Sequence, residues 1–105
     1  MTWPIVQTGI QNALSCGASA VSLTLPSTAN TRIKPTHAII NVVGASIRWR
    51  ADGTAPTATA GILVAAGSNI EFMDGTINYQ SLIERFQAIA TSGTATLEVA
   101  FFAGD

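Results

Sequence analysis

The residues that could carry acid–base chemistry are few and lie far apart along the chain. General acid–base catalysis needs two titratable groups held together in one cleft, whereas the carboxylates here occur singly. Two of them precede a glycine, which is typical of turns, and two others fall on the polar side of alternating segments. The pattern therefore predicts no catalytic pair and no enzyme. The carboxylates are Asp52 and Asp74 in the turns, Glu71 and Glu98 on the polar sides, and Glu84 and Asp105.

The chain has one cysteine, Cys16, and one histidine, His37. A single cysteine excludes an intrachain disulfide, and one residue of each type leaves too few ligands for a zinc site. The sequence Ser15-Cys16-Gly17 favours a turn or a small pocket for the thiol, and we expect His37 to be partly buried or on a strand surface. No glycine-rich loop precedes a helix, as a phosphate site would require. The sequence thus predicts no catalytic residue, no metal and no cofactor.

The charge of the chain narrows the choice of partners. Only 10% of its 105 residues are charged, and five basic and six acidic side chains leave a net charge of −1. A typical soluble domain is about 25% charged. No basic field is present to hold nucleic acid, and no polybasic patch, apolar run of about 20 residues or signal peptide indicates a membrane. We therefore expect neither nucleic acid nor a membrane as partner.

The same composition points to contacts with other chains. The sequence is 48% hydrophobic, with a mean hydropathy of +0.38. Charges of both signs and a net charge away from zero keep small domains apart in solution, and this chain has little of either. The composition favours a homo-oligomer that buries part of its surface against other subunits.

Arg48-Trp49-Arg50 is the segment with the clearest alternative interpretations. An aromatic ring between two guanidinium groups can stack on a base or a sugar, or anchor an interface. Strand alternation instead places Ile47 and Trp49 inward as core, and leaves both arginines outside as a contact patch. The choice between core and ligand platform for Trp49 stays open here.

Further interface candidates lie near the amino end and late in the chain. Trp3 has no periodic partner nearby, and it either caps the domain or inserts into a neighbour. Glu84 and Arg85 are adjacent and could form one half of an ion pair between subunits. The predicted contact residues are Trp3, Arg48, Arg50, Glu84 and Arg85.

Most of the chain alternates apolar and polar residues with the period of a β-strand, and turn residues interrupt it every eight to twelve positions. The segments 5–14 and 81–89 fit neither the strand period nor the helix period well, and the segment 81–89 could hold a helical turn. Seven or eight short strands predict an all-β fold, an antiparallel β-sandwich or small barrel, in a single domain over 1–105. The clearest strands are expected at 21–25, 36–43, 46–50, 69–73, 86–91 and 97–101.

Three links between strands have recognisable turn chemistry. Thr91-Ser92-Gly93-Thr94 joins two alternating runs and predicts an antiparallel hairpin, and Asp74-Gly75 gives a similar signal between Phe72 and Ile77. Residues 52–57 are predicted to form a longer loop, because Pro56 cannot lie in the middle of a β-ladder.

From Ile47 onward the sequence resembles small virion-associated proteins of tailed bacteriophages. The resemblance rests on Ile47-Arg48-Trp49-Arg50, Asp52-Gly53-Thr54, Pro56-Thr57, Thr59, Leu63 and Ala66-Gly67, and on the alternating residues Phe86, Ala88, Ala90, Leu97, Val99 and Phe101 around Ser92-Gly93-Thr94-Ala95. It covers about the last 60 residues.

The resemblance implies a small β-sandwich or barrel subunit of the virion, and it supplies no catalytic residues. The leading hypothesis is a non-enzymatic capsid decoration or cementing protein. Such a protein would contact the major capsid protein, stabilise the head, and reside in the host cytoplasm during assembly. The alternatives are a neck or tail accessory protein, and a carbohydrate- or host-surface-binding module that uses Trp49 as its platform.

Overall fold

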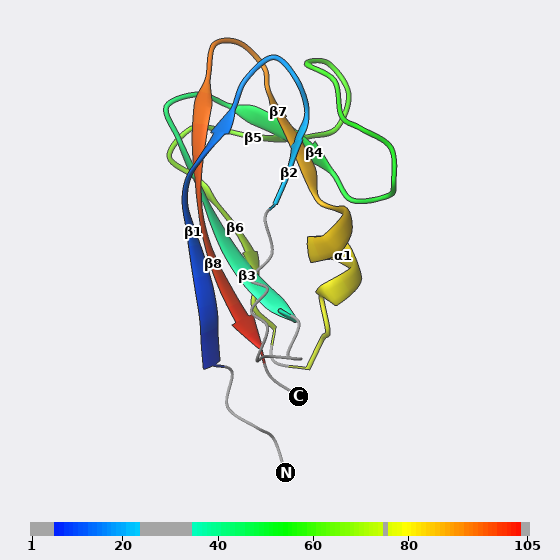
Figure 1. The fold of residues 1–105 in the computed structure, drawn as a ribbon. Coiled ribbons are helices and arrows are strands. Elements are labelled where there is room, and N and C mark those ends of the chain that lie inside the picture. The colour runs from blue at the N-terminus through cyan, green and yellow to red at the C-terminus, as the bar shows by residue number, and fades with distance from the viewer. Residues whose placement is uncertain (1–5, 24–34, 75, 104–105) are drawn as a thin grey trace.

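The fold is a sandwich of two antiparallel sheets, as the alternation predicts (Figure 1). The computed structural model describes residues 6–23, 35–74 and 76–103, so Trp3 lies outside the described residues. Eight strands and one short helix are found in this part of the chain. They are β1 (Val6–Cys16), β2 (Val21–Ser22), β3 (His37–Val43), β4 (Ile47–Arg50), β5 (Ile62–Val64), β6 (Asn69–Phe72), α1 (Gln80–Arg85), β7 (Gln87–Ala90) and β8 (Ala95–Ala103).

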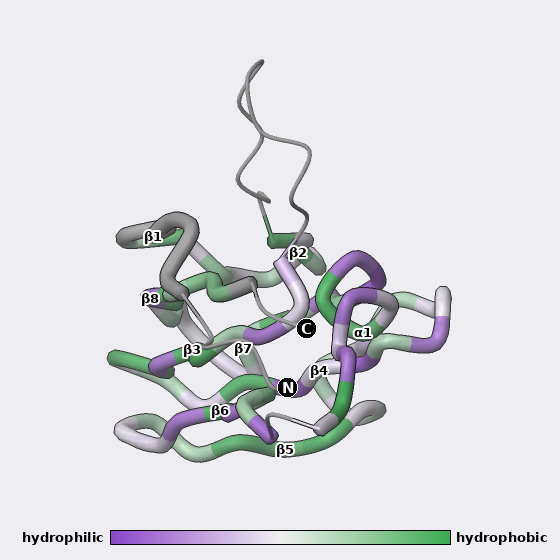
Figure 2. The backbone as a smooth tube through the Cα atoms, turned by 90° about the horizontal axis from the view of Figure 1, so that it is seen from below, coloured by the Kyte–Doolittle hydropathy of each residue, from purple (hydrophilic) through white to green (hydrophobic). Residues whose placement is uncertain are grey.

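Each sheet has four strands, and the helix lies beside the second sheet. The first sheet has the order β1-β8-β3-β6 and the second the order β2-β7-β4-β5. Seen from below, the two sheets form separate layers, with α1 on the side of β4 (Figure 2). The order places β5 and β6 at edges of their sheets, joined by the short link 65–68.

The core fills the space between the sheets with the inward residues of alternating strands. Ile40 and Val42 from β3 and Leu97, Val99 and Phe101 from β8 are all essentially inaccessible to solvent. Ile83 of α1 is the buried residue of the helix and belongs to the same cluster. Because apolar burial contributes about 25 cal/mol per Å², this cluster is the main source of stability in a chain without disulfides.

The predicted hairpin around Thr91-Ser92-Gly93-Thr94 is wrong, although the turn itself is present. β7 pairs with β2 and β4 in one sheet, while β8 pairs with β1 and β3 in the other. β7 is therefore hydrogen-bonded along both edges and has no edge left for β8. The Thr91 amide also donates to the Ser46 carbonyl at 3.0 Å, which extends the pairing of β7 with β4 by one residue beyond Ala90. Gly93 adopts a φ of 67°, and the chain crosses to the opposite sheet.

The second predicted hairpin, at Asp74-Gly75, is also wrong in the described residues. Gly75 itself lies outside them, but the Ile77 amide donates to the Asp74 carbonyl at 3.1 Å, so the chain does turn here. A helix, α1, follows in place of a strand. The helical turn considered for 81–89 is thereby confirmed over its first residues, and the ambiguous segment 5–14 is mostly strand β1.

Candidate interaction surface

Trp49 belongs to the core and also borders the surface. Its ring stacks on Phe86, with centroids 5.3 Å apart and planes inclined by 23°, and meets Phe72 edge-on at 5.7 Å. These contacts confirm the core interpretation, because such aromatic pairs add stability beyond the area they bury. The indole nevertheless remains partly accessible at the end of β4.

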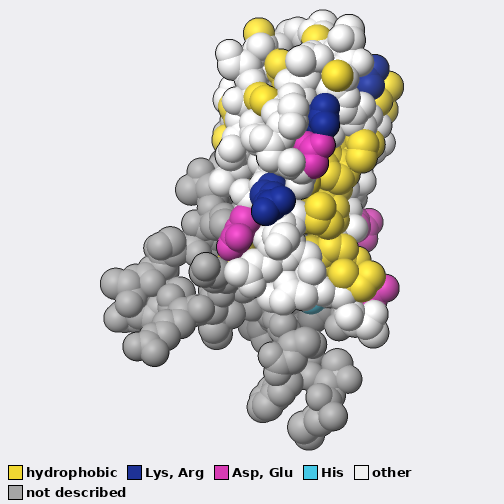
Figure 3. Space-filling model, turned by 90° about the vertical axis from the view of Figure 1, so that its right-hand side faces the viewer, with side chains coloured by type: hydrophobic (Ala, Val, Ile, Leu, Met, Phe, Trp, Pro, Cys, Tyr) yellow, Lys and Arg dark blue, Asp and Glu magenta, His cyan; other side chains and the backbone are white. Residues whose placement is uncertain are grey.

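The accessible part of Trp49 lines a shallow hollow between β4, β5 and α1. The hollow has a volume of about 420 Å³. Ile62 of β5 and Leu82 of α1 contribute to its apolar lining, and Arg50 and Asp52 line the same site. On this side of the molecule, hydrophobic side chains gather in a strip flanked by neighbouring basic and acidic groups (Figure 3). The surface defined by Trp49, Ile62 and Leu82 is called the β5–α1 surface below.

Arg48 binds within its own chain. Its Nε donates to the Ala58 carbonyl at 3.1 Å, and its Nη1 donates to the Gly61 carbonyl at 2.9 Å. The guanidinium thus holds the loop that leads into β5. Gly61 has a φ of 130°, and a Cβ there would lie 3.1 Å from the Trp49 carbonyl oxygen. Only glycine fits this position without strain.

Arg50 is paired with Asp52 through two hydrogen bonds, one of them from Nε to Oδ1 at 3.1 Å. The Thr54 amide also donates to Asp52, at 3.2 Å, which confirms the predicted turn. The hydrogen bonds from Arg50 and Thr54 lower the pKa of Asp52 to about 2. The two arginines therefore shape this region from within the chain, and their predicted role between subunits stays a prediction.

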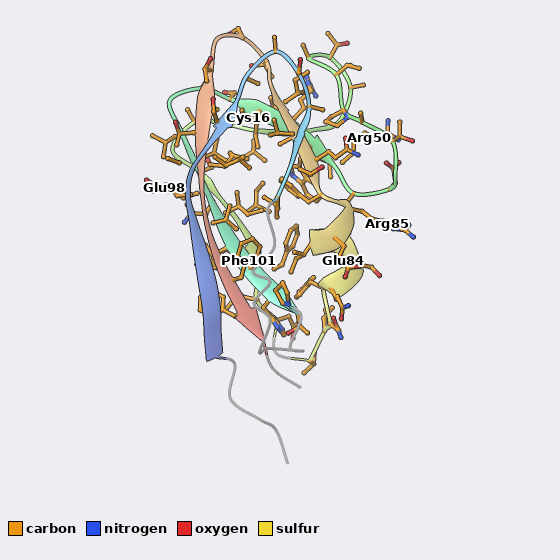
Figure 4. All side chains as sticks on the ribbon, in the orientation of Figure 1. Cys16, Arg50, Glu84, Arg85, Glu98 and Phe101 are labelled. Carbon is orange, nitrogen blue, oxygen red and sulfur yellow. The ribbon has the colours of Figure 1, made fainter. Side chains whose placement is uncertain are left out.

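Glu84 and Arg85 project outward from α1, on the side of the molecule where Arg50 lies (Figure 4). Both residues are exposed, and Gln80 donates a hydrogen bond from Nε2 to Glu84 Oε1 at 3.2 Å. Arg85 lies in the last turn of the helix, where a positive charge interacts favourably with the helix dipole. Their predicted pairing with another subunit stays a prediction.

Of the other titratable groups in the described residues, Asp74 lies in a turn, Glu71 and Glu98 lie on exposed strand faces, and Cys16 is buried. Asp74 Oδ1 accepts hydrogen bonds from the amide and hydroxyl of Thr76 at 2.9 and 2.7 Å, and these bonds lower the pKa of the carboxyl. Glu71 and Glu98 are exposed, as expected for polar strand faces. Burial raises the pKa of the Cys16 thiol, which lies at the end of β1 rather than in a turn.

His37 is more deeply buried than the sequence predicts. Only 1% of its surface is accessible, because it begins β3 beneath the turn before α1 and contacts Tyr79 edge-on. Its Nε2 lies 2.9 Å from the Asp74 carbonyl oxygen, and its Nδ1 lies 2.7 Å from Thr36 Oγ1. A carbonyl only accepts, so Nε2 carries the proton and Nδ1 accepts from the threonine. The imidazole joins β3 to the segment that positions α1.

The most exposed large apolar side chains of the described residues are on β5, which sequence reasoning did not single out. Ile62 and Leu63 are each 56% accessible. A signal was present in the sequence, because no charged residue occurs between Gly53 and Ile70, and Ile62-Leu63-Val64 is the most apolar part of that run. The run contains β5 and both of its flanking loops.

Among the described residues, no three His, Cys, Asp or Glu side chains group as metal ligands. No helix within 6–23, 35–74 or 76–103 is long and apolar enough to cross a membrane. Compared with protein families, curated proteins and solved structures, the chain has no significant match.

Proposed function

We propose that this protein is a non-enzymatic structural subunit of a bacteriophage virion, and that it stabilises the capsid as a decoration protein by packing against neighbouring subunits. The observation that supports the proposal most is the exposed apolar surface that consists of the β5–α1 surface and Leu63 of β5. Contiguous apolar patches larger than a few hundred Å² are rare on soluble monomers and commonly mark interaction sites. The virion setting comes from the resemblance of residues 47–101 to phage proteins.

The sandwich is suited to this role because its contacts can act without any chemical step. Each contact that removes apolar surface from water contributes about 25 cal/mol per Å², and a shell repeats the same contact at every symmetric position. A modest contact area per subunit can therefore stabilise the whole particle. The polar groups beside the surface, Arg48, Arg50 and Asp52, already have partners within the chain. Docking there leaves Arg50 and Asp52 as an ion pair and leaves the Arg48 guanidinium hydrogen-bonded to carbonyl groups.

Binding to capsids purified without this protein tests the proposal. We expect the wild-type chain to co-sediment with such capsids and to raise their melting temperature. Leu82→Glu adds a charge to the β5–α1 surface and should abolish both effects while the fold is kept. Val43→Glu is the matched control, because Val43 is 42% accessible on the outer face of the other sheet.

Failure of the wild-type chain to bind capsids would exclude the decoration role. Electron microscopy of virions carrying a labelled chain then tests the neck or tail alternative. A decoration protein appears over the whole shell, and a neck or tail protein appears at one end of the particle.

The hollow supports a second candidate function, the binding of a small carbohydrate. Its volume of about 420 Å³ lies within the range of ligand pockets, and it combines the Trp49 ring with the planar polar groups of Arg50 and Asp52. Sugars bind where an aromatic face lies beside groups that hydrogen-bond hydroxyls. Asp52→Asn would leave the fold intact and weaken glycan binding on an array, whereas capsid binding would be unaffected.

A further inference from the structure

Among the edge strands of the described residues, β5 is the longest that has neither a register shift nor a charged side chain. Among the described residues, two register shifts interrupt the pairing of β1. The second shift lies between Gln11 and Leu14, where Ala13 has a φ of 55°. β2 ends after two residues, and β6 carries the exposed Glu71. Bulges, short length and charges are the usual protections of sheet edges. β5 is also short, but its three residues are all apolar and uncharged, and its pairing with β4 has no register shift.

Both faces of β5 are apolar and exposed. Ile62 pairs with Trp49 and so points to the inner side of its sheet, whereas Leu63 pairs with Arg48 and points to the outer side. Each is 56% accessible. A protein docking on one face of the sheet would cover only one of these side chains. A strand added beside β5, in the plane of the sheet, would cover both and would use the backbone groups that point away from β4.

The surroundings of β5 favour a second copy of this chain as the added strand. An antiparallel pair of identical strands is self-complementary about a two-fold axis, so each copy offers what the other requires. The uncharged run from Gly53 to Ile70 brings no like charges together when two copies meet. The nearest guanidinium, that of Arg48, is held by the Ala58 and Gly61 carbonyls. A different partner would normally be selected by complementary charge, which this edge does not present.

We propose that two copies pair β5 with β5 in antiparallel orientation about a two-fold axis at Leu63, which joins the two sheets β2-β7-β4-β5 into one continuous sheet. Leu63 then lies opposite its counterpart, and Ile62 lies opposite Val64. The dimer rests on the proposed structural function for its biological setting, but its geometry does not depend on the capsid.

Cross-linking through a cysteine at the proposed axis tests the pairing. Directly opposite residues in an antiparallel pair have Cβ atoms about 4.5–5.5 Å apart, within reach of mild oxidation or a short bis-maleimide. In a Cys16→Ala background, we expect Leu63→Cys to give a covalent dimer at low protein concentration. Ile77→Cys, with 47% accessibility outside β5, is the matched control and should stay monomeric. Equal cross-linking of the two variants would overturn the pairing.

A charge at the axis provides a second test that does not depend on the cross-link. Leu63→Lys places two like charges opposite each other and should raise the dimer dissociation constant by about tenfold or more. Circular dichroism checks that the fold is kept, and Val43→Lys is the control that should leave the dimer unchanged. A folded Leu63→Lys chain that dimerises like wild type overturns the proposal. Capsid binding is measured separately: binding without β5 cross-linking refutes only the dimer, and cross-linking without binding refutes only the decoration role.

Discussion

The indole of Trp49 lies on the ring of Phe86 with their centroids 5.3 Å apart. This pair connects the interior of the sandwich to its candidate contact surface, because Phe86 is fully buried and Trp49 also lines the hollow beside Ile62 and Leu82. The same side chain thus contributes to stability and to surface shape. Experiments that alter Trp49 must separate the two roles.

Trp49→Ala should destabilise the fold by about 3 kcal/mol, the lower end of the range for aromatic truncation, because the ring is only partly buried. Trp49→Phe keeps an aromatic ring over Phe86 and should lower the free energy of unfolding much less. Urea denaturation of both variants gives the two free energies of unfolding. If both variants had nearly the same free energy of unfolding as the wild type, Trp49 would not support the core.

Gly61→Ala should be more destabilising than Gly53→Ala. Both glycines have positive φ values, which cost a residue with a Cβ about 1–3 kcal/mol. A Cβ at Gly61 also meets the Trp49 carbonyl, Arg48 Cβ and Pro56 Cβ at 3.1–3.3 Å, whereas a Cβ at Gly53 meets nothing within 4 Å. Thermal melting of the two variants measures the difference, and an equal loss would contradict the crowding seen at Gly61.

The Arg50–Asp52 pair should make stability fall in acid. The pKa of Asp52 is lowered from its ordinary 3.8 to about 2, so the folded state favours the charged carboxylate. Its contribution is fully present above the ordinary value and is lost as the pH falls through 3.8 towards 2. Asp52→Asn should reduce the stability difference between neutral pH and this acid range. Chemical denaturation across the range tests the sign, and a variant with the wild-type pH profile would argue against the pair.

His37 should be found as the tautomer protonated at Nε2. The Asp74 carbonyl can only accept a hydrogen bond, and this assigns the proton to the nitrogen 2.9 Å away. Two-bond ¹⁵N–¹H correlation spectra of the imidazole distinguish the tautomers while His37 is neutral. A neutral ring protonated at Nδ1 would rule out the contact that joins β3 to the turn before α1.

The sequence predicts the strands better than their partners. Alternation in the segment Asn69–Phe72 correctly separates buried Ile70 and Phe72 from exposed Glu71, because burial on one face is a local property of a strand. Pairing is not local. Nothing in residues 91–94 shows that β2 and β4 already occupy both edges of β7, so a hairpin and a crossing between sheets give the same sequence signal.

The candidate surface was only partly predictable for a related reason. The alternation of Ile47 and Trp49 correctly indicates the inward face of β4, but it cannot show that the indole also reaches a hollow formed with α1. The bonds of Arg48 to the carbonyls of Ala58 and Gly61 depend on a loop conformation that composition does not reveal. Exposure of Ile62 and Leu63 follows from the place of β5 at a sheet edge, which is set by the tertiary fold.

Sedimentation equilibrium of the wild-type chain and of Leu63→Lys tests the central claim, that this protein assembles through β5, most directly. We predict that the wild type approaches twice the chain mass of 10.9 kDa at micromolar concentration, and that folded Leu63→Lys has a mass closer to that of the single chain at the same concentration. A wild-type chain that remains at 10.9 kDa throughout, or a variant that matches the wild type, would contradict assembly through this edge.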